Sequence, residues 1–100
     1  MAVINSKVIS GELAGATSAT QGPDIDCLKV TFKAVYGNSG NVYLGGAGVT
    51  IVDASTDATT GLELDAGDEI TLTIGNLSLV YRICDNAGDD LTYIALTAAA

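Results

Sequence analysis

The chain contains 100 residues, enough for one domain with a hydrophobic core of its own. Twelve acidic residues against three lysines and one arginine give a net charge of −8, and such a surface repels nucleic acid instead of recruiting it. The absence of histidine excludes Ser-His-Asp and Cys-His catalysis and most catalytic zinc sites.

The N-terminal quarter of the chain is poor in bulky core residues. Val3–Ile9 has the composition of a weak strand, whereas Ser10–Asp26 is dominated by Gly, Ala, Ser and Thr and contains the Gly22-Pro23 pair. We interpret Ser10–Asp26 as an extended or mobile arm that contributes little to the core. The alternative, in which Val3–Ile9 is simply an edge strand of the body, stays open.

Two segments show the regular alternation that is typical of half-buried strands. In Cys27–Tyr36 apolar residues alternate with lysines and a threonine, and in Glu69–Ile74 they alternate with a glutamate and two threonines. The apolar sides of these two strands are therefore predicted to lie in the core. The predicted core positions are Leu28, Val30, Phe32, Ile70, Leu72 and Ile74.

Shorter strands complete the expected fold. They are expected at Val42–Leu44, Val49–Val52, Leu77–Cys84 and Leu91–Leu96, separated by turns rich in Gly and Asn. The fold class is therefore all-β: a small β-sandwich or barrel of about seven to eight short antiparallel strands with an extended N-terminal arm. Residues 1–26 are expected to form the first strand and the flexible arm, 27–96 the body, and 97–100 a frayed tail.

Five carboxylates are available for general acid and base catalysis. They are Asp65, Asp68, Glu69, Asp89 and Asp90. Each lies in a turn signal, where an acidic side chain usually accepts hydrogen bonds from nearby backbone. We therefore predict that the protein is not an enzyme.

The loop Asp53–Gly61 places oxygen-bearing side chains at alternate positions, as a calcium-binding loop does. An EF-hand would have Gly where Ala58 stands and a bidentate Glu where Leu64 stands, and no helical pattern flanks the loop. We expect no essential metal and no cofactor. Whether this loop binds calcium or a glycan stays open.

Tyrosines are the residues that favour a carbohydrate site, because aromatic rings stack on the apolar faces of sugars. Such side chains lie more often in a core or an interface, with one end in water. The four candidates are Tyr36, Tyr43, Tyr81 and Tyr93.

Two cysteines are too few for a disulfide-stabilised scaffold and have no metal-binding spacing. Strand parity groups Cys27 with Lys29 and Cys84 with Arg82, so both thiols are expected away from the most hydrophobic face. Reduced thiols in a cytoplasm are the default expectation. The sequence leaves open whether Cys27 and Cys84 pair.

No membrane partner is expected. No run approaches the roughly 20 apolar residues that a membrane-spanning helix needs. Asn5, Ser6 and Lys7 also interrupt the only segment with the apolar character of a signal sequence.

Four runs of the chain resemble a pattern in small virion proteins of tailed bacteriophages. The runs are Asn38–Gly46, Val49-Thr50, Gly61–Asp68 and Leu77–Ile83, and the resemblance covers about residues 28–96. In that family a turn of the form N-x-G-x-V-Y-x-G-G precedes G-x-x-L-x-A-G-[DE] and a strand containing L-x-x-V-Y-x-I. Leu77, Val80, Tyr81 and Ile83 occupy the last motif here.

The resemblance implies a β-sandwich or barrel module attached to a phage head, collar or fibre, with a capsid decoration (cement) protein as the leading case. Its partner is then the major capsid protein of the shell, and the protein is assembled in the host cytoplasm and lies on the capsid surface of the virion. The long Asp53–Gly61 loop departs from the family's compact pattern. The alternatives are a collar, tail or head-fibre module, or a carbohydrate-binding β-sandwich.

Self-association is expected because the core is thin, with 26 Val, Ile and Leu but only five aromatic residues. A small domain of this kind gains stability by burying one face against copies of itself. Together with the resemblance, this favours a homotrimer. The docking segment, Ala2–Gly22, joins the first strand to most of this arm and is expected to contact the shell through Val3, Ile4, Val8, Ile9 and Leu13.

Overall fold

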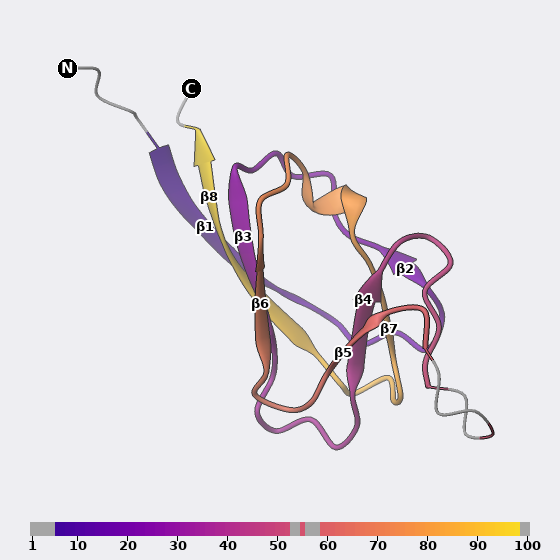
Figure 1. Ribbon diagram of the computed structural model, residues 1–100. Helices are drawn as coiled ribbons and strands as arrows, with labels where there is room; N and C mark the ends of the chain where they lie inside the picture. Colours follow the sequence, from indigo (N-terminus) through magenta and orange to yellow (C-terminus); the bar gives the residue numbers. More distant parts are fainter. Residues whose placement is uncertain (1–5, 53–54, 56–58, 99–100) are drawn as a thin grey trace.

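The computed structural model describes residues 6–52, 55 and 59–98, and these residues form two antiparallel sheets packed face to face (Figure 1). Sheet A contains, in spatial order, β1 (Ser6–Leu13), β8 (Leu91–Ala98), β3 (Lys29–Ala34) and β6 (Glu69–Leu72). Sheet B contains β2 (Thr20–Gln21), β7 (Tyr81–Cys84), β4 (Val42–Gly45) and β5 (Leu62–Leu64). The predicted all-β fold of short antiparallel strands is confirmed.

Some strand assignments differ from those expected. Val49–Val52 is a loop, because Val49 turns back onto Gly46 through a backbone hydrogen bond of 3.0 Å and is buried there. Leu77–Leu79 forms a 3₁₀ turn, η1, which begins after Asn76, whose side chain accepts a hydrogen bond from the Ser78 N–H. The short strand β5 was not predicted.

The core lies between the two sheets and follows the predicted alternation over most of its length. Val30 and Phe32 on β3 are each 1% exposed, and Ile70, Leu72 and Ile74 are half-buried against the same cluster. The buried cluster also contains Cys27, Ala34, Val42, Leu44, Leu64, Leu77, Cys84, Leu91 and Ala95. Five of the six predicted core positions therefore pack in or against the core.

Leu28 is the exception, since it is 46% exposed. Its N–H donates to the Leu96 carbonyl at 2.8 Å, which continues sheet A beyond the start of β3. At this end sheet A extends beyond sheet B (Figure 1). The Leu28 side chain is therefore on the core side of sheet A but has no strand of sheet B opposite it. Alternation alone does not give the length of the opposing sheet.

Both thiols lie in the core, contrary to the parity argument. Cys27 precedes β3 and its Sγ donates to the Ile74 carbonyl at 3.1 Å, while Cys84 is the last residue of β7. Both cysteines are free. Burial is the main cause of the raised pKa of each thiol, so neither is predisposed to ionise.

The interpretation of residues 10–26 as an arm apart from the body requires correction. Ser10–Leu13 belong to β1, which pairs with β8 over eight residue pairs from Ser6 to Leu13. Ile9 and Leu13 pack against the core from this strand. The edge-strand alternative thus accounts for the described part of Val3–Ile9.

The chain between β1 and β2 lies closely along the body. The Gly15 N–H donates to Asp90 Oδ1 at 2.8 Å, and the Ala16 carbonyl accepts from the Cys84 N–H at 2.7 Å. A Cβ on Gly15 would lie 2.5 Å from the Asp89 carbonyl oxygen, and one on Gly22 would lie 2.3 Å from that of Leu77. The small residues do permit close approach to a surface, but that surface is the chain's own body.

The C-terminal end of the described chain is part of sheet A. Thr97 and Ala98 pair with Lys7 and Ser6, so these two residues do not form a separate tail. Residues 99 and 100 of the expected frayed tail lie outside the described residues.

We predict that Phe32→Ala lowers the free energy of unfolding by about 3–5 kcal/mol, through lost burial and a residual cavity. Leu28→Ala should lower it by less than about 1 kcal/mol, because that side chain is already half in water. Urea denaturation of both variants measures the difference. Equal losses would show that the core is placed wrongly at this end of β3.

Candidate interaction surface

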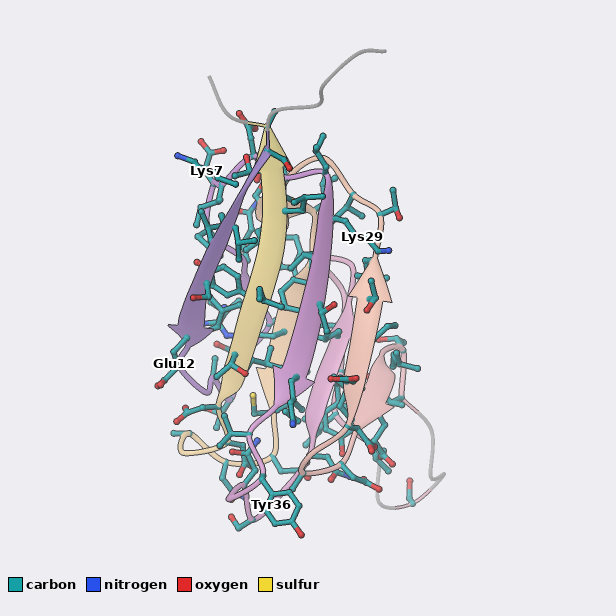
Figure 2. All side chains as sticks on the ribbon, turned by 90° about the vertical axis from the view of Figure 1, so that its left-hand side faces the viewer. Lys7, Glu12, Lys29 and Tyr36 are labelled. Atoms are coloured by element: carbon teal, nitrogen blue, oxygen red, sulfur yellow. The ribbon has the colours of Figure 1, made fainter. Side chains whose placement is uncertain are left out.

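The outer face of sheet A carries the exposed apolar residues of its strands. Val30, Phe32 and Ala34 face the core, so the alternate positions on β3 face outward. The register places Ile94 opposite Thr31 and Leu96 opposite Lys29 on that outward side. Val8 lies opposite Leu96 on the neighbouring strand β1. Side chains of β1, β8 and β3 therefore form one continuous outer surface (Figure 2).

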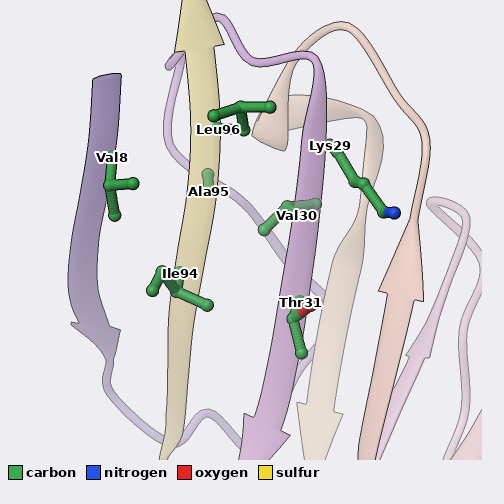
Figure 3. Close-up of a pocket in the computed structure, with 7 residues that line it drawn as sticks. All are labelled: Val8, Lys29, Val30, Thr31, Ile94, Ala95 and Leu96. Atoms are coloured by element: carbon green, nitrogen blue, oxygen red, sulfur yellow. The ribbon is translucent and has the colours of Figure 1, made fainter. Parts of the chain in front are cut away.

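Three residues, Val8, Ile94 and Leu96, form what we call the sheet A patch. Their exposed fractions are 64%, 53% and 38%. They border a shallow depression of about 170 Å³, which Figure 3 shows between β1 and β3. Its remaining lining residues are Lys29, Val30, Thr31 and Ala95. Neighbouring apolar side chains left in water on a flat sheet are typical of an interaction surface.

Charge is divided between sheet A and the rest of the chain. The strands of sheet A contain three lysines and two glutamates, a net charge of +1, so the remaining residues carry −9. Lys29 borders the depression next to Leu96. The apolar patch therefore lies on the sheet whose strands carry a small positive charge, in a protein that is acidic as a whole.

The outer face of sheet B is covered by the chain itself. Tyr43 on β4 is 2% exposed although it alternates with the core residues Val42 and Leu44. Its hydroxyl donates to Asp85 Oδ1 at 3.2 Å, and the loop after β4 packs over this side, with Val49 and Gly61 in contact. Sheet A has no comparable cover among the described residues.

A second apolar groove lies on the open side of the sandwich, between the edge strands β5 and β6. Its volume is about 300 Å³, and Leu62 and Leu79 beside it are 47% and 62% exposed. The groove is otherwise lined by Leu44, Gly45, Gly46, Ile70, Leu72 and Val80. Four of these, Leu44, Ile70, Leu72 and Val80, belong to the core cluster or pack against it, so the groove is an opening of the core itself.

None of the five candidate catalytic carboxylates lines either of the two grooves described above. Asp65 and Asp68 belong to the β5–β6 connection, where Asp68 Oδ2 accepts from the Asp65 N–H at 3.0 Å, and Glu69 is the first residue of β6. Asp89 and Asp90 belong to the β7–β8 connection and accept from backbone of other loops. Among residues 6–52, 55 and 59–98 no group of three or more metal-binding side chains occurs.

Asp89 is a structural carboxylate, 1% exposed. Its Oδ1 accepts from the Ser39 and Gly40 N–H groups, both at 3.1 Å. Its Oδ2 accepts from the backbone N–H and the Nδ2 of Asn86, both at 3.0 Å. Burial raises the pKa of Asp89, but these hydrogen bonds outweigh burial and hold the pKa below its ordinary value. The carboxylate therefore fixes two loops at one end of the sandwich.

The tyrosines do not assemble into a carbohydrate-binding face. Tyr43 is buried on the outer side of sheet B, while Tyr93 on β8 packs against the core between the sheets. Tyr36 is 84% exposed in the loop after β3 (Figure 2), and Tyr81 is half-buried on β7. No two of the four share one exposed surface.

The loop proposed for calcium lies largely outside the described residues. Asp53, Ala54, Thr56, Asp57 and Ala58 are not described. At its base, Thr60 Oγ1 accepts from the Thr50 N–H and donates to the Gly48 carbonyl, both at 3.0 Å. These bonds close the base of the loop beside sheet B.

The predicted docking residues do not lie on one surface. Val3 and Ile4 lie outside the described residues, Val8 belongs to the sheet A patch, and Ile9 and Leu13 face the core. Sequence reasoning missed Ile94 and Leu96. A signal for them existed in Leu91–Leu96, which was predicted as a strand with apolar residues on both sides.

No protein-family model matches the chain, and no curated protein matches it. A chain from a solved structure described as "Bacillus endospore appendages form a novel family of disulfide-linked pili" is similar over 97% of this chain and 89% of that one. The TM-score is 0.49 and the identity 12%. Among the described residues no helix is long and apolar enough to cross a membrane.

We predict that Asp89→Asn lowers the free energy of unfolding at neutral pH by about 2–3 kcal/mol, because buried N–H groups lose a charged acceptor. The folded-state pKa of Asp89 lies below its unfolded value, so its stabilisation is complete above about pH 4 and is lost as the pH falls through the folded-state pKa. The difference between wild type and variant should therefore shrink in acid.

Urea denaturation at several pH values between about 2 and 7 measures this dependence. The difference in stability should change only below about pH 4, the pKa of an unfolded Asp. Glu12→Gln, at an exposed position of β1, serves as the control and should have little effect at any pH. A loss in Asp89→Asn that is the same at every pH would contradict the assigned role of the carboxylate.

Proposed function

We propose that this protein is a structural, non-enzymatic subunit that attaches to a protein assembly through the outer face of sheet A. The observation that carries this proposal is the sheet A patch, where Val8, Ile94 and Leu96 are all left in water on one flat surface. A monomeric β-sandwich gains nothing from such exposure. Burying these side chains against another protein would be favourable by the apolar area removed from water.

The assembly that we propose is the capsid of a tailed phage, with this chain as a decoration protein on its surface and the major capsid protein as its partner. The support for this part is the sequence resemblance over about residues 28–96. The charge distribution fits such a role, because a shell-bound sheet A would leave the acidic remainder facing solvent. A strongly acidic exterior keeps particles apart.

A single copy would bind weakly, since the patch contains only three apolar side chains of partial exposure. Several linked copies on a repeating lattice would bind far more tightly than one, because each later contact is intramolecular. The proposal therefore includes an oligomer. A collar, tail or head-fibre module would use the same face, whereas a carbohydrate-binding role lacks a shared surface for the tyrosines.

We predict that Ile94→Glu weakens binding to shells at least tenfold, about 1.4 kcal/mol, by placing a charge within an apolar contact. Shells assembled from the major capsid protein encoded in the same genome are the binding target, and co-sedimentation gives the bound fraction. Leu79→Glu is the matched control, because Leu79 is similarly exposed but lies on η1 beside the groove between β5 and β6, and not on the outer face of sheet A.

Two results would contradict the proposal at different levels. Wild-type protein that does not sediment with the shells, or a genome without a capsid gene, would contradict the capsid role. Binding that survives Ile94→Glu but is lost in Leu79→Glu would contradict the choice of face.

A further inference from the structure

The free edge of β1 is unlike the other sheet edges of the described chain. β1 has eight residues and, among residues 6–52, 55 and 59–98, pairs with β8 alone, so within this part of the chain one whole side of its backbone has no strand beside it. The other edge strands, β2, β5 and β6, have two, three and four residues. A long free edge offers unpaired N–H and C=O groups to any other strand.

The features that usually protect an edge are sparse in β1. Its sequence contains no proline, and its register with β8 continues without a bulge over all eight pairs. The charged residues are Lys7 and Glu12, near its two ends, and Val8 between them is 64% exposed. Natural edge strands are commonly shielded by bulges, prolines or charges, so this edge is suited to strand pairing.

We propose that β1 pairs antiparallel with β1 of a second copy, about a two-fold axis perpendicular to sheet A. The two four-stranded sheets would then form one continuous eight-stranded sheet. The proposal does not depend on the capsid role, since it concerns only a strand edge and its own side chains. We choose a second copy of the chain as the partner because β1 is complementary to itself in side-chain parity and charge.

Side-chain parity limits the possible registers. Residues that lie opposite one another in an antiparallel pair point to the same face, so an outward residue of one copy must face an outward residue of the other. Two such registers use seven residues of β1, one centred on Ile9 and one on Ser10. In the second, Val8 would lie opposite the partner's Glu12, which places an apolar side chain against a carboxylate.

The register centred on Ile9 fits better. Val8 then lies opposite the partner's Ser10 and diagonal to the partner's Val8, within the reach of diagonal neighbours, about 7–8 Å. Because Leu96 lies beside Val8 in each copy, the two sheet A patches join into one apolar stripe across the axis. Val8 thereby gains an apolar neighbour across the axis, while Ile94 and Leu96 stay exposed on the outer face of the joined sheet.

Charge also agrees with this register. Lys7 lies opposite the partner's Gly11, so the two Lys7 positions are four residues, or about 13 Å, apart along the strand direction. The two Glu12 positions are six residues, or about 20 Å, apart. No like charges of β1 face each other, and the strand is compatible with its own copy.

The dimer should be reversible. One strand pair with its flanking side chains buries less than the roughly 1,600 Å² of a standard stable interface, which favours dissociation constants in the micromolar range. Pairing would also place two sheet A outer faces in one plane, doubling the surface available to any shared partner.

Sedimentation equilibrium over a micromolar concentration range tests the proposal with two variants. Val8→Lys with Ser10→Lys places two lysines opposite one another in both Val8–Ser10 pairs across the axis, and it should weaken the dimer at least tenfold. Val8→Lys with Ser10→Glu places a lysine opposite a glutamate in the same two pairs, and it should restore most of the wild-type association. Both positions are exposed, so thermal melting should show that both variants remain folded.

The expected wild-type result is a mass that rises with concentration from 10.1 kDa towards two copies. A mass that stays at one copy, or that reaches three copies, would overturn the two-fold pairing, and the second result would favour the trimer expected from the sequence. Association unchanged in both double variants would also overturn it. None of these results depends on whether the protein binds shells.

Discussion

The pairing of β8 with both β1 and β3 is the interaction on which the rest of the structure depends. It joins β1 to β3 within sheet A, and the two paired strands β3 and β8 contribute Phe32 and Leu91 to the core. Since alternate residues of a strand face opposite sides, β8 also presents Ile94 and Leu96 outward. One strand therefore supplies part of the core and most of the candidate interaction surface.

The two outer faces of the sandwich differ in how far the rest of the chain covers them. The loop after β4 folds back over sheet B and buries Tyr43. The segment after β1 instead crosses to sheet B along the end and side of the body, held by the Gly15–Asp90 and Ala16–Cys84 hydrogen bonds. Among the described residues neither segment covers the outer face of sheet A, and this uncovered face is the one on which the proposed attachment rests.

Local patterns in the sequence predicted the parts of the fold that depend on neighbouring residues. The alternation in β3 and β6 gave Phe32 and Leu72 correctly, because half-buried strands have a period of two. Leu28 follows the same alternation but is exposed, since its burial depends on how far the opposite sheet extends. The small residues of Ser10–Asp26 were interpreted as a mobile arm, but they lie closely along the body, because composition does not say which surface a segment approaches.

The candidate site was predicted only in part for the same reason. Val8 was identified from the apolar N-terminal run, whereas Ile94 and Leu96 lie in a strand with apolar residues on both sides, so parity could not say which side faces the core. The turn role expected of Asp89 is seen in its bond from the Asn86 N–H, whereas its partners Ser39 and Gly40 lie some 50 residues away in the chain and were not predicted. Contacts between distant loops leave no local signal.

Electron cryo-microscopy of the assembly that carries this chain would test the central claim most directly. The account predicts that the outer face of sheet A, with Ile94 and Leu96, is covered by a neighbouring protein chain while Tyr36 and the loop after β4 face solvent. A map in which that face of sheet A is open to solvent, and the contact is made instead by the groove between β5 and β6, would contradict it.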